Sequence, residues 1–203
     1  MKPSARRIAL VGSPGSGKTT LASELARRTG LPLHHLDDLY WHEGWTPTPK
    51  EAWRSIVVEQ VRAPEWIIDG NYADTLDLRI DACDLIIFLD LPRTLCSTRI
   101  LRRYLSHALG QRELLPARIR ASEKPPRVGT GKLAFLRFVW SFPKAVRPEL
   151  MRQLQTASAA TQVRILRSQR DVRGFLADFP LSSKAGQAGA ARGTQGPTAQ
   201  TPT

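Results

Sequence analysis

Residues 12–19 of the 203-residue chain read Gly12-Ser13-Pro14-Gly15-Ser16-Gly17-Lys18-Thr19 and match G-x-x-x-x-G-K-[ST] at every fixed position. Glycines let the backbone N–H groups of such a turn point inward and surround phosphate oxygens. Lys18 places a cation on the β and γ phosphates, and the Thr19 hydroxyl can ligate Mg²⁺. The stretch therefore predicts a phosphate-binding loop, the P-loop, with Thr20 as a further binding residue.

The residues on both sides of the P-loop have the pattern that its geometry requires. Residues 6–11 form a short apolar run typical of a buried strand, and residues 17–28 predict a helix that Gly30 and Pro32 end. The positive N-terminal end of that helix would point at the same bound anion. Strand, loop and helix together predict binding of ATP or GTP with Mg²⁺.

Further apolar runs alternate with helical patterns along the chain. Strands are expected over residues 33–36, 66–69, 85–89 and 163–166, and helices over 50–62, 93–108, 132–142, 149–157 and 172–179. The alternation predicts an α/β fold with a parallel sheet covered by helices on both faces. Thr48-Pro49-Lys50-Glu51 has the form of a capping box with proline at the first helical position. Pro143 is expected to end the helix over 132–142.

Composition predicts one domain with a tail. Residues 1–181 hold every expected element, whereas residues 182–203 have no large apolar side chain and are expected to be disordered. Cys83 and Cys96 lie too far apart for a zinc motif or a disulfide framework. No window approaches the roughly 18 apolar residues of a membrane helix, and the N-terminal apolar run is too short for a signal peptide. We expect a cytoplasmic monomer with no membrane partner.

Positive charge is concentrated in one segment. Residues 93–170 contain 17 Lys and Arg against 3 Asp and Glu, a net +14 that exceeds the +12 of the whole chain. Such a block is expected to bind nucleotide phosphates, nucleic acid or a lipid surface, and the alternative is a solvated face with no ligand. We interpret residues 93–160 as a basic insertion that forms a lid.

Carboxylates follow three of the expected strands. Asp69, Asp90 and the pair Asp37 and Asp38 each come directly after an apolar run. A P-loop needs a second group that organises the metal ion, and the carboxyl ends of parallel strands meet at the edge where ligands bind. Each aspartate is a candidate for this role, and the alternative is that each only caps a helix or turn.

These residues occur in an arrangement that resembles the bacterial DNA topology modulation proteins, which are P-loop proteins similar to adenylate kinases. The resemblance covers about residues 6–180 and rests on Gly12 to Thr20, His35-Leu36-Asp37, Trp41, Gly44-Trp45, the run from Trp66 to Tyr72, and the run from Phe88 to Pro92. It implies a nucleoside monophosphate kinase fold with sheet order 2-3-1-4-5. It also implies that Asp69 is the carboxylate that holds Mg²⁺ through water.

The resemblance further assigns roles to three arginines. Thr98 to Arg103 is similar to the arginine-bearing helix that leads into the adenylate kinase lid, which would place Arg99 against the base and Arg103 on the phosphates. Arg167 would lie in the loop that touches the base. Adenylate kinases hold the AMP phosphate with an arginine where this chain has Asn71 and Tyr72, which argues against AMP as the acceptor. Residues 93–160 contain a single cysteine, Cys96, which excludes a zinc ion held by several cysteines of the lid.

Two functions remain open from the sequence. In the first, the protein transfers the γ-phosphoryl group of MgATP to a small acceptor, with Lys18, Arg99 and Arg103 neutralising charge and Asp37 orienting or deprotonating the acceptor hydroxyl. In the second, it is a nucleotide-dependent nucleic-acid-binding regulator, although no helix-turn-helix, zinc-finger or RNA-binding signature is present. We favour the first, with weak and non-specific nucleic-acid binding through the basic segment. The four histidines are interpreted as structural, and Trp41, Trp45 and Trp53 as either acceptor-pocket or core residues.

Overall fold

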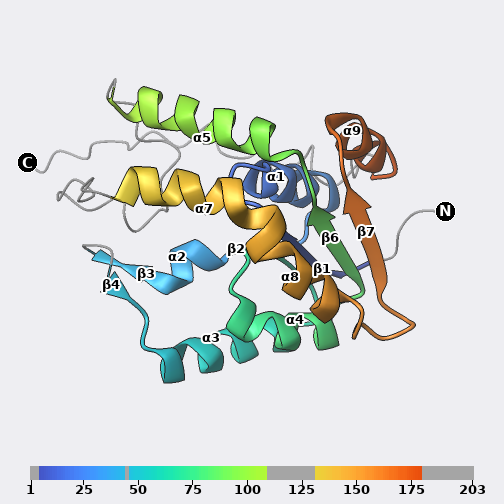
Figure 1. Ribbon diagram of the computed structural model, residues 1–203. Coiled ribbons are helices and arrows are strands. Elements are labelled where there is room, and N and C mark those ends of the chain that lie inside the picture. Colours follow the sequence, from blue (N-terminus) through green and yellow to red (C-terminus); the bar gives the residue numbers. More distant parts are fainter. Residues whose placement is uncertain (1–4, 44–45, 109–130, 180–203) are drawn as a thin grey trace, which may run out of the picture.

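A five-stranded parallel sheet with helices on both faces forms the centre of the molecule (Figure 1). The computed structural model describes residues 5–43, 46–108 and 131–179. The strands are β1 (Arg7–Gly12), β2 (Leu33–His35), β5 (Trp66–Asp69), β6 (Leu85–Leu89) and β7 (Gln162–Leu166), in the order β2-β5-β1-β6-β7. Numbered among themselves, these strands give the predicted order 2-3-1-4-5. A short antiparallel pair, β3 (Trp41–His42) and β4 (Thr46–Pro47), lies outside this sheet.

The two faces of the sheet carry different helices because successive strand residues point to opposite sides. Ile8 and Leu10 of β1 pack in one buried cluster with α1 (Lys18–Thr29) and α9 (Gln169–Ala177). Ala9 and Val11 pack in a second cluster on the other face. That cluster includes residues of α2 (Leu36–Tyr40), α3 (Lys50–Arg62), α4 (Leu76–Ala82), α7 (Gly131–Ala145) and α8 (Arg147–Leu154). A 3₁₀ turn, η2 (Ala73–Thr75), precedes α4, and α5 (Arg93–Ala108) follows β6.

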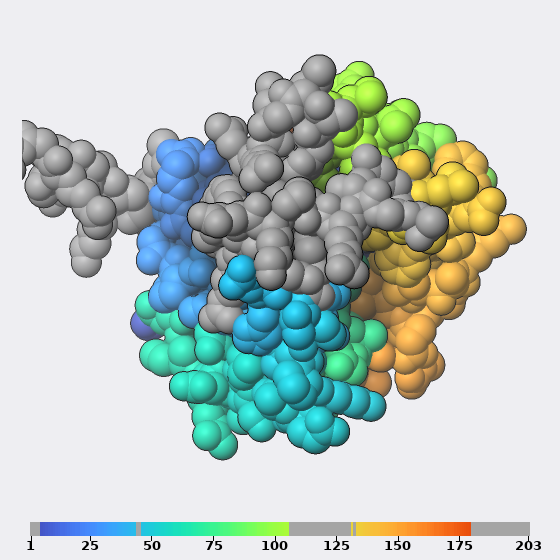
Figure 2. Space-filling view, turned by 90° about the vertical axis from the view of Figure 1, so that its left-hand side faces the viewer, coloured from blue at the N-terminus to red at the C-terminus, as the bar shows by residue number. Residues whose placement is uncertain are grey.

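A third cluster joins α5 to α7, where Cys96 and Ile100 of α5 pack against Val139 of α7. In the side view, α3 in teal lies at the bottom of the molecule, α5 in green at the top, and the yellow and orange residues from α7 onward at the right (Figure 2). Helices α5 and α7 therefore pack against each other beside the P-loop. No helix in the described ranges has both the length and the apolar character to cross a membrane.

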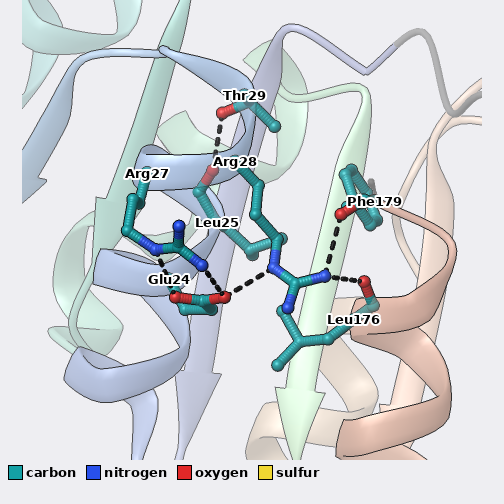
Figure 3. Close-up of polar contacts among 7 residues, drawn as sticks. All are labelled: Glu24, Leu25, Arg27, Arg28, Thr29, Leu176 and Phe179. Carbon is teal, nitrogen blue, oxygen red and sulfur yellow. Dashed lines mark hydrogen bonds and ion pairs between the residues drawn. The ribbon is translucent and has the colours of Figure 1, made fainter. Parts of the chain in front are cut away.

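Arg28 joins the end of α1 to the end of α9 (Figure 3). Its Nη1 donates hydrogen bonds to the carbonyl oxygens of Leu176 and Phe179 at 2.6 and 3.0 Å, and its Nε donates to Glu24 Oε1 at 2.6 Å. Glu24 also accepts from Arg27, and these two arginines lower the pKa of Glu24 to about 2. This contact holds α1 and α9 together on the face of the sheet that both helices cover.

Two local expectations about helix ends are wrong. The side chain of Thr48 does not cap α3, because its hydroxyl donates to the carbonyl oxygens of Leu39 and Tyr40 instead. Pro49 is the N-cap residue, so α3 begins at Lys50 without a capping box. Helix α7 does not end before Pro143 but continues to Ala145. Burial of Val139 and Phe142, which are 0% and 3% exposed, offsets the hydrogen bond that proline cannot donate.

Other boundaries differ because of contacts that a periodic pattern does not show. The sequence did not predict α2, which begins directly where β2 ends. Helix α9 begins at Gln169 because Ser168 accepts a hydrogen bond from Asp171 N while the Asp171 carboxylate accepts from Ser168 N. The tail expected over residues 182–203 lies outside the described residues.

Candidate functional site

The P-loop connects β1 to α1 and is confined by two neighbouring elements. Gly12 and Gly15 have φ values of 148° and 79°, which side chains rarely adopt. A Cβ atom at Gly12 would lie 2.5 Å from the carbonyl oxygen of Leu89, and one at Gly15 would lie 2.5 Å from that of Cys96. Strand β6 and helix α5 therefore pack directly against the loop, which explains why glycine is needed at both positions.

Lys18 lies inside the ring of the P-loop. Its Nζ donates to the carbonyl oxygens of Gly12 and Ser13 at 2.8 and 3.0 Å. Burial lowers the pKa of Lys18, and the charges of Asp69 and Asp37 oppose that shift. Since α1 begins at Lys18, the helix N-terminus and the ammonium group together make this ring attractive to phosphate.

Asp69, at the end of β5, contacts the P-loop helix. Thr19 Oγ1 donates to Asp69 Oδ2 at 2.8 Å, and His35 Nδ1 lies 3.2 Å from the same oxygen. The hydrogen bond to Asp69 raises the pKa of His35. The other carboxylate oxygen, Asp69 Oδ1, is buried and has no hydrogen-bond partner among the described residues. A buried carboxylate oxygen left unpaired in this way fits a hard cation such as Mg²⁺.

The hydroxyl and carboxylate are also the kind of ligands that Mg²⁺ uses. Within residues 5–43, 46–108 and 131–179, no group of three or more His, Cys, Asp or Glu side chains is arranged to hold a metal ion. Mg²⁺ at a nucleotide site takes one or two protein oxygens and completes its shell with waters and phosphates. Thr19 and Asp69 fit that pattern.

Asp90, the competing strand-end carboxylate, is engaged elsewhere. Arg147 of α8 forms an ion pair with it, with Nη2 2.9 Å from Oδ2 and Nε 2.9 Å from Oδ1. Strand β5 places Asp69 opposite Leu10 of β1, whereas Asp90 follows the last residue of β6. Of the two carboxylates, Asp69 is therefore the one that contacts the P-loop helix.

A buried arginine fixes the turn that follows β5. Arg79 is fully buried, and its guanidinium donates to the carbonyl oxygens of Gly70, Asn71 and Tyr72. The Asn71 side chain accepts a hydrogen bond from Gly12 N at 2.9 Å, which links this turn to the P-loop. Tyr72 has a φ of 30° and is the single described non-glycine residue with a positive φ. No local pattern indicates this role of Arg79, since its partners lie seven to nine residues before it.

Asp37 lies beside the side chain of Tyr72. The Tyr72 hydroxyl donates to Asp37 Oδ1 at 2.7 Å, and burial together with the Asp37 charge raises the pKa of Tyr72, which keeps the phenol protonated. The ring of Tyr72 packs against those of Tyr40 and Trp53 with centroid separations of 4.8 Å. Trp53 is fully buried and belongs to the core, while Trp41 is half-buried beside Tyr40. Trp45 lies outside the described residues.

The arginines predicted from α5 lie near the P-loop. Arg99 Nη1 donates to the carbonyl oxygen of Ser16 at 2.9 Å and is 3.4 Å from that of Gly15. Arg103 is half-buried, and its positive charge contributes to lowering the pKa of Lys18. Arg167 is exposed after β7, where its backbone N donates to Asp171 Oδ2. Strand β6 lies between β7 and β1 in the sheet.

The remaining predicted residues belong to the P-loop itself or to the first turn of α1. Ser13 Oγ donates to the carbonyl oxygen of Pro14, and Ser16 Oγ is buried without a partner among the described residues. Gly17 has a φ of 95°, and Thr20 is exposed on α1. The expectation that the histidines are structural missed the contact of His35 with Asp69. The available signal was the position of His35 two residues before Asp37. His42 Nε2 lies 3.0 Å from Thr48 Oγ1, as a structural histidine would.

Comparisons with known proteins agree with this architecture. No protein-family model and no curated protein matches the sequence. Among solved structures, the chain is similar to a shikimate kinase from Acinetobacter baumannii in complex with shikimate, with 19% identity over 85% of this chain and 89% of that one and a TM-score of 0.51. An unliganded sugar kinase from Janibacter sp. HTCC2649 aligns with 16% identity over 89% and 97% of the two chains and a TM-score of 0.48. The P-loop, the sheet order and the likeness to the shikimate kinase show that the chain has an α/β P-loop NTPase fold.

Proposed function

We propose that this protein is a phosphotransferase that moves the γ-phosphoryl group of ATP, bound with Mg²⁺, to the hydroxyl group of a small acceptor. The contact of Thr19 with Asp69 beside Lys18 is the observation that carries the proposal. A glycine-rich loop alone could bind any anion. A threonine hydroxyl lies next to a buried carboxylate, of which one oxygen, Asp69 Oδ1, has no hydrogen-bond partner among the described residues. These are groups that a metal–nucleotide complex requires.

Thr19 and Asp69 would hold the Mg²⁺ ion, Thr19 directly and Asp69 through water. When bound, the ion neutralises charge on the β and γ phosphates. Lys18, the backbone N–H groups of the loop and the N-terminus of α1 bind the same phosphates. Arg99 and Arg103 lie near the loop and would stabilise the charge that develops on the transferred group.

Asp37 is proposed to orient the acceptor and take its proton. Tyr72 occupies Oδ1 of this carboxylate, which leaves Oδ2 for the acceptor hydroxyl. As the acceptor oxygen forms its bond to the γ phosphorus, the bond from that phosphorus to the β,γ-bridging oxygen breaks and ADP leaves. The hydroxyl proton passes to Asp37 Oδ2. Positioning and charge neutralisation supply the rate enhancement in such transfers.

The finer assignment follows the resemblance to DNA topology modulation proteins and their similarity to adenylate kinases. It favours ATP as the donor, while Asn71 and Tyr72 argue against AMP as the acceptor. Shikimate belongs in any acceptor panel because the structurally similar kinase was solved with it.

Nucleotide-dependent nucleic-acid binding is a second candidate, and one observation favours it. Trp140 of α7 is 48% exposed, and the guanidinium of Arg93 lies 4.3 Å from its ring centroid. An exposed aromatic ring beside arginines can stack on bases and contact phosphates. Tight DNA binding at about 150 mM salt, with a log–log salt slope of roughly −0.9 per phosphate contact, would support this candidate over the first.

The test is ATP turnover against a panel of nucleosides, nucleotides, sugars and shikimate, measured as acceptor-dependent ADP formation. Asp69→Asn is expected to lower turnover by about 100-fold or more while changing ATP affinity far less, since it disturbs the metal and not the phosphate loop. Asp90→Asn is the matched control at the neighbouring strand end. A larger loss of turnover in Asp90→Asn than in Asp69→Asn would contradict the assignment.

A further inference from the structure

We infer that the acceptor is a hydroxyl compound without a phosphate or carboxylate group, of the nucleoside or sugar class, and that Asp37 and the aromatic side chains beside it bind it. The inference rests on the proposed function and concerns the acceptor half of the same site. Three features of this half support it, namely its position in the sheet, its charge and its side chains.

The strand order fixes where the acceptor binds. In the order β2-β5-β1, the P-loop follows β1, Asp69 ends β5, and Asp37 lies two residues after the end of β2. His35 and Asp69 are register partners, and adjacent strands lie about 4.8 Å apart. The phosphates therefore lie at β1 and the metal at β5, which leaves the next position along this edge, at β2, for the acceptor.

The segments at this position carry several carboxylates and no lysine or arginine. Residues 31–49 contain no lysine or arginine and three carboxylates, Asp37, Asp38 and Glu43. Residues 63–78 likewise contain no lysine or arginine and hold four carboxylates. An acceptor that already carries a phosphate would bring its negative charges to the carboxylate of Asp37, which opposes binding.

Three described arginines that contact these segments or the P-loop beside them are already engaged. Arg79 is buried and donates to three backbone carbonyls, so its guanidinium does not reach a ligand. Arg54 Nη2 lies 2.6 Å from Asp77 Oδ2, and its Nη1 donates to the carbonyl oxygen of Asp74. Arg99 of α5 donates to Ser16 in the P-loop. None of these three side chains is placed to hold a second phosphate.

The side chains that remain suit an uncharged ring compound with hydroxyl groups. Asp37 is exposed, and its Oδ2 has no hydrogen bond to any described residue, so it can accept from an acceptor hydroxyl. Tyr40, Trp41 and Tyr72 are half-buried and present apolar ring surface next to that carboxylate. Small-molecule sites commonly combine such apolar walls with a few polar groups that orient the ligand.

The test needs no identified acceptor. Calorimetric titration compares MgATP with the Mg²⁺ complex of the compound that joins two adenosines through five phosphates. Where an acceptor site binds phosphate, this compound fills both sites and gains affinity as a bivalent ligand. Here we expect it to bind within about 10-fold of MgATP. Binding that is tighter by more than this would overturn the inference and leave the proposed function standing, whereas binding of neither compound would overturn both.

A pair of variants links the result to Asp37. The quantity compared is the ratio of the affinity for the five-phosphate compound to the affinity for MgATP. Asp37→Asn is expected to raise this ratio by at least about 3-fold, because it removes a repulsive charge. Asp178→Asn, an exposed aspartate at the end of α9, is expected to leave the ratio unchanged. An unchanged ratio in Asp37→Asn would contradict the placement of the acceptor. Faster phosphoryl transfer to a nucleoside monophosphate than to its nucleoside would also overturn the inference.

Discussion

The two halves of the site are built in different ways. The proposed donor half is a contiguous loop that brings together backbone N–H groups, Lys18 and the N-terminus of α1, and Arg99 of α5 donates to the carbonyl oxygen of Ser16 in it. The acceptor half is assembled from α2, the turn after β5 and the buried Arg79, and it presents carboxylate and aromatic groups. The first half would bind a nucleoside triphosphate, whereas the second would decide which molecule receives the phosphoryl group.

The largest expected effect tests whether α5 serves the donor half. Arg103→Ala should lower acceptor-dependent turnover by about 1,000-fold, because such losses of charge stabilisation in phosphoryl transfer are of that order. Arg102→Ala, at the exposed neighbouring position, should change turnover by less than about 3-fold. Steady-state kinetics of both variants gives the answer. Equal losses would mean that α5 acts through its total charge and not through a residue placed at the loop.

Lys18→Ala removes the cation from the donor half. MgATP affinity should fall by about 10- to 100-fold, the equivalent of the roughly 1.5–3 kcal/mol that a hydrogen bond to a charged group contributes. Calorimetric titration with MgATP measures the change, and circular dichroism checks the fold. Lys50→Ala, at an exposed lysine of α3, provides the control. Wild-type affinity in Lys18→Ala would show that the loop does not bind phosphate through this side chain.

Arg79→Met separates the acceptor half from the donor half. Three carbonyl oxygens would lose their donor, which should lower the free energy of unfolding by about 3 kcal/mol. Arg54→Met removes an exposed ion pair and should cost no more than about 1 kcal/mol. Urea denaturation of both variants makes the comparison. If Arg79→Met were as stable as Arg54→Met, the turn after β5 would not depend on this arginine.

The smallest expected effect lies where the two halves meet. Asn71→Ala removes the acceptor of the Gly12 N–H group and should weaken MgATP by about 2- to 10-fold, as the loss of one ordinary hydrogen bond does. Gln169→Ala, on the exposed surface of α9, should have no effect on the same titration. A loss as large as that of Lys18→Ala would mean that the turn after β5 shapes the whole P-loop.

What the sequence predicted follows the same division. The P-loop and the strands at its sides were predicted because glycine positions and apolar runs are local patterns, whereas the sheet order was predicted from the family resemblance. The assignment of Thr19 to the metal and of Asp69 beside it stays a prediction, which their hydrogen bond supports. The sequence could not rank Asp69 above Asp90 from the residues themselves, since the Arg147 ion pair joins residues 57 apart.

The acceptor half was harder to predict because its contacts are not periodic. Thr48 occurs in a sequence typical of a helix cap, but its hydroxyl donates to the carbonyl oxygens of Leu39 and Tyr40 at the end of α2. Asn71 was noted as a departure from the adenylate kinase pattern. Its hydrogen bond with Gly12 joins residues 59 apart, so no local sequence pattern predicts it. His35 was interpreted as structural because no metal spacing surrounds it, and only the pairing of β2 with β5 brings it to Asp69.

The close packing of Gly12 against Leu89 has a consequence for how the chain folds. The P-loop lies near the start of the chain, but its walls come from Asn71 and Leu89, which are synthesised 59 and 77 residues later. Closing loops of that length is slow compared with forming local helices. During synthesis the nucleotide loop therefore acquires its shape only after β6 has emerged and paired with β1. Nucleotide binding by a growing chain would report the pairing of β6 with β1, and ATP would stabilise that late state and none before it.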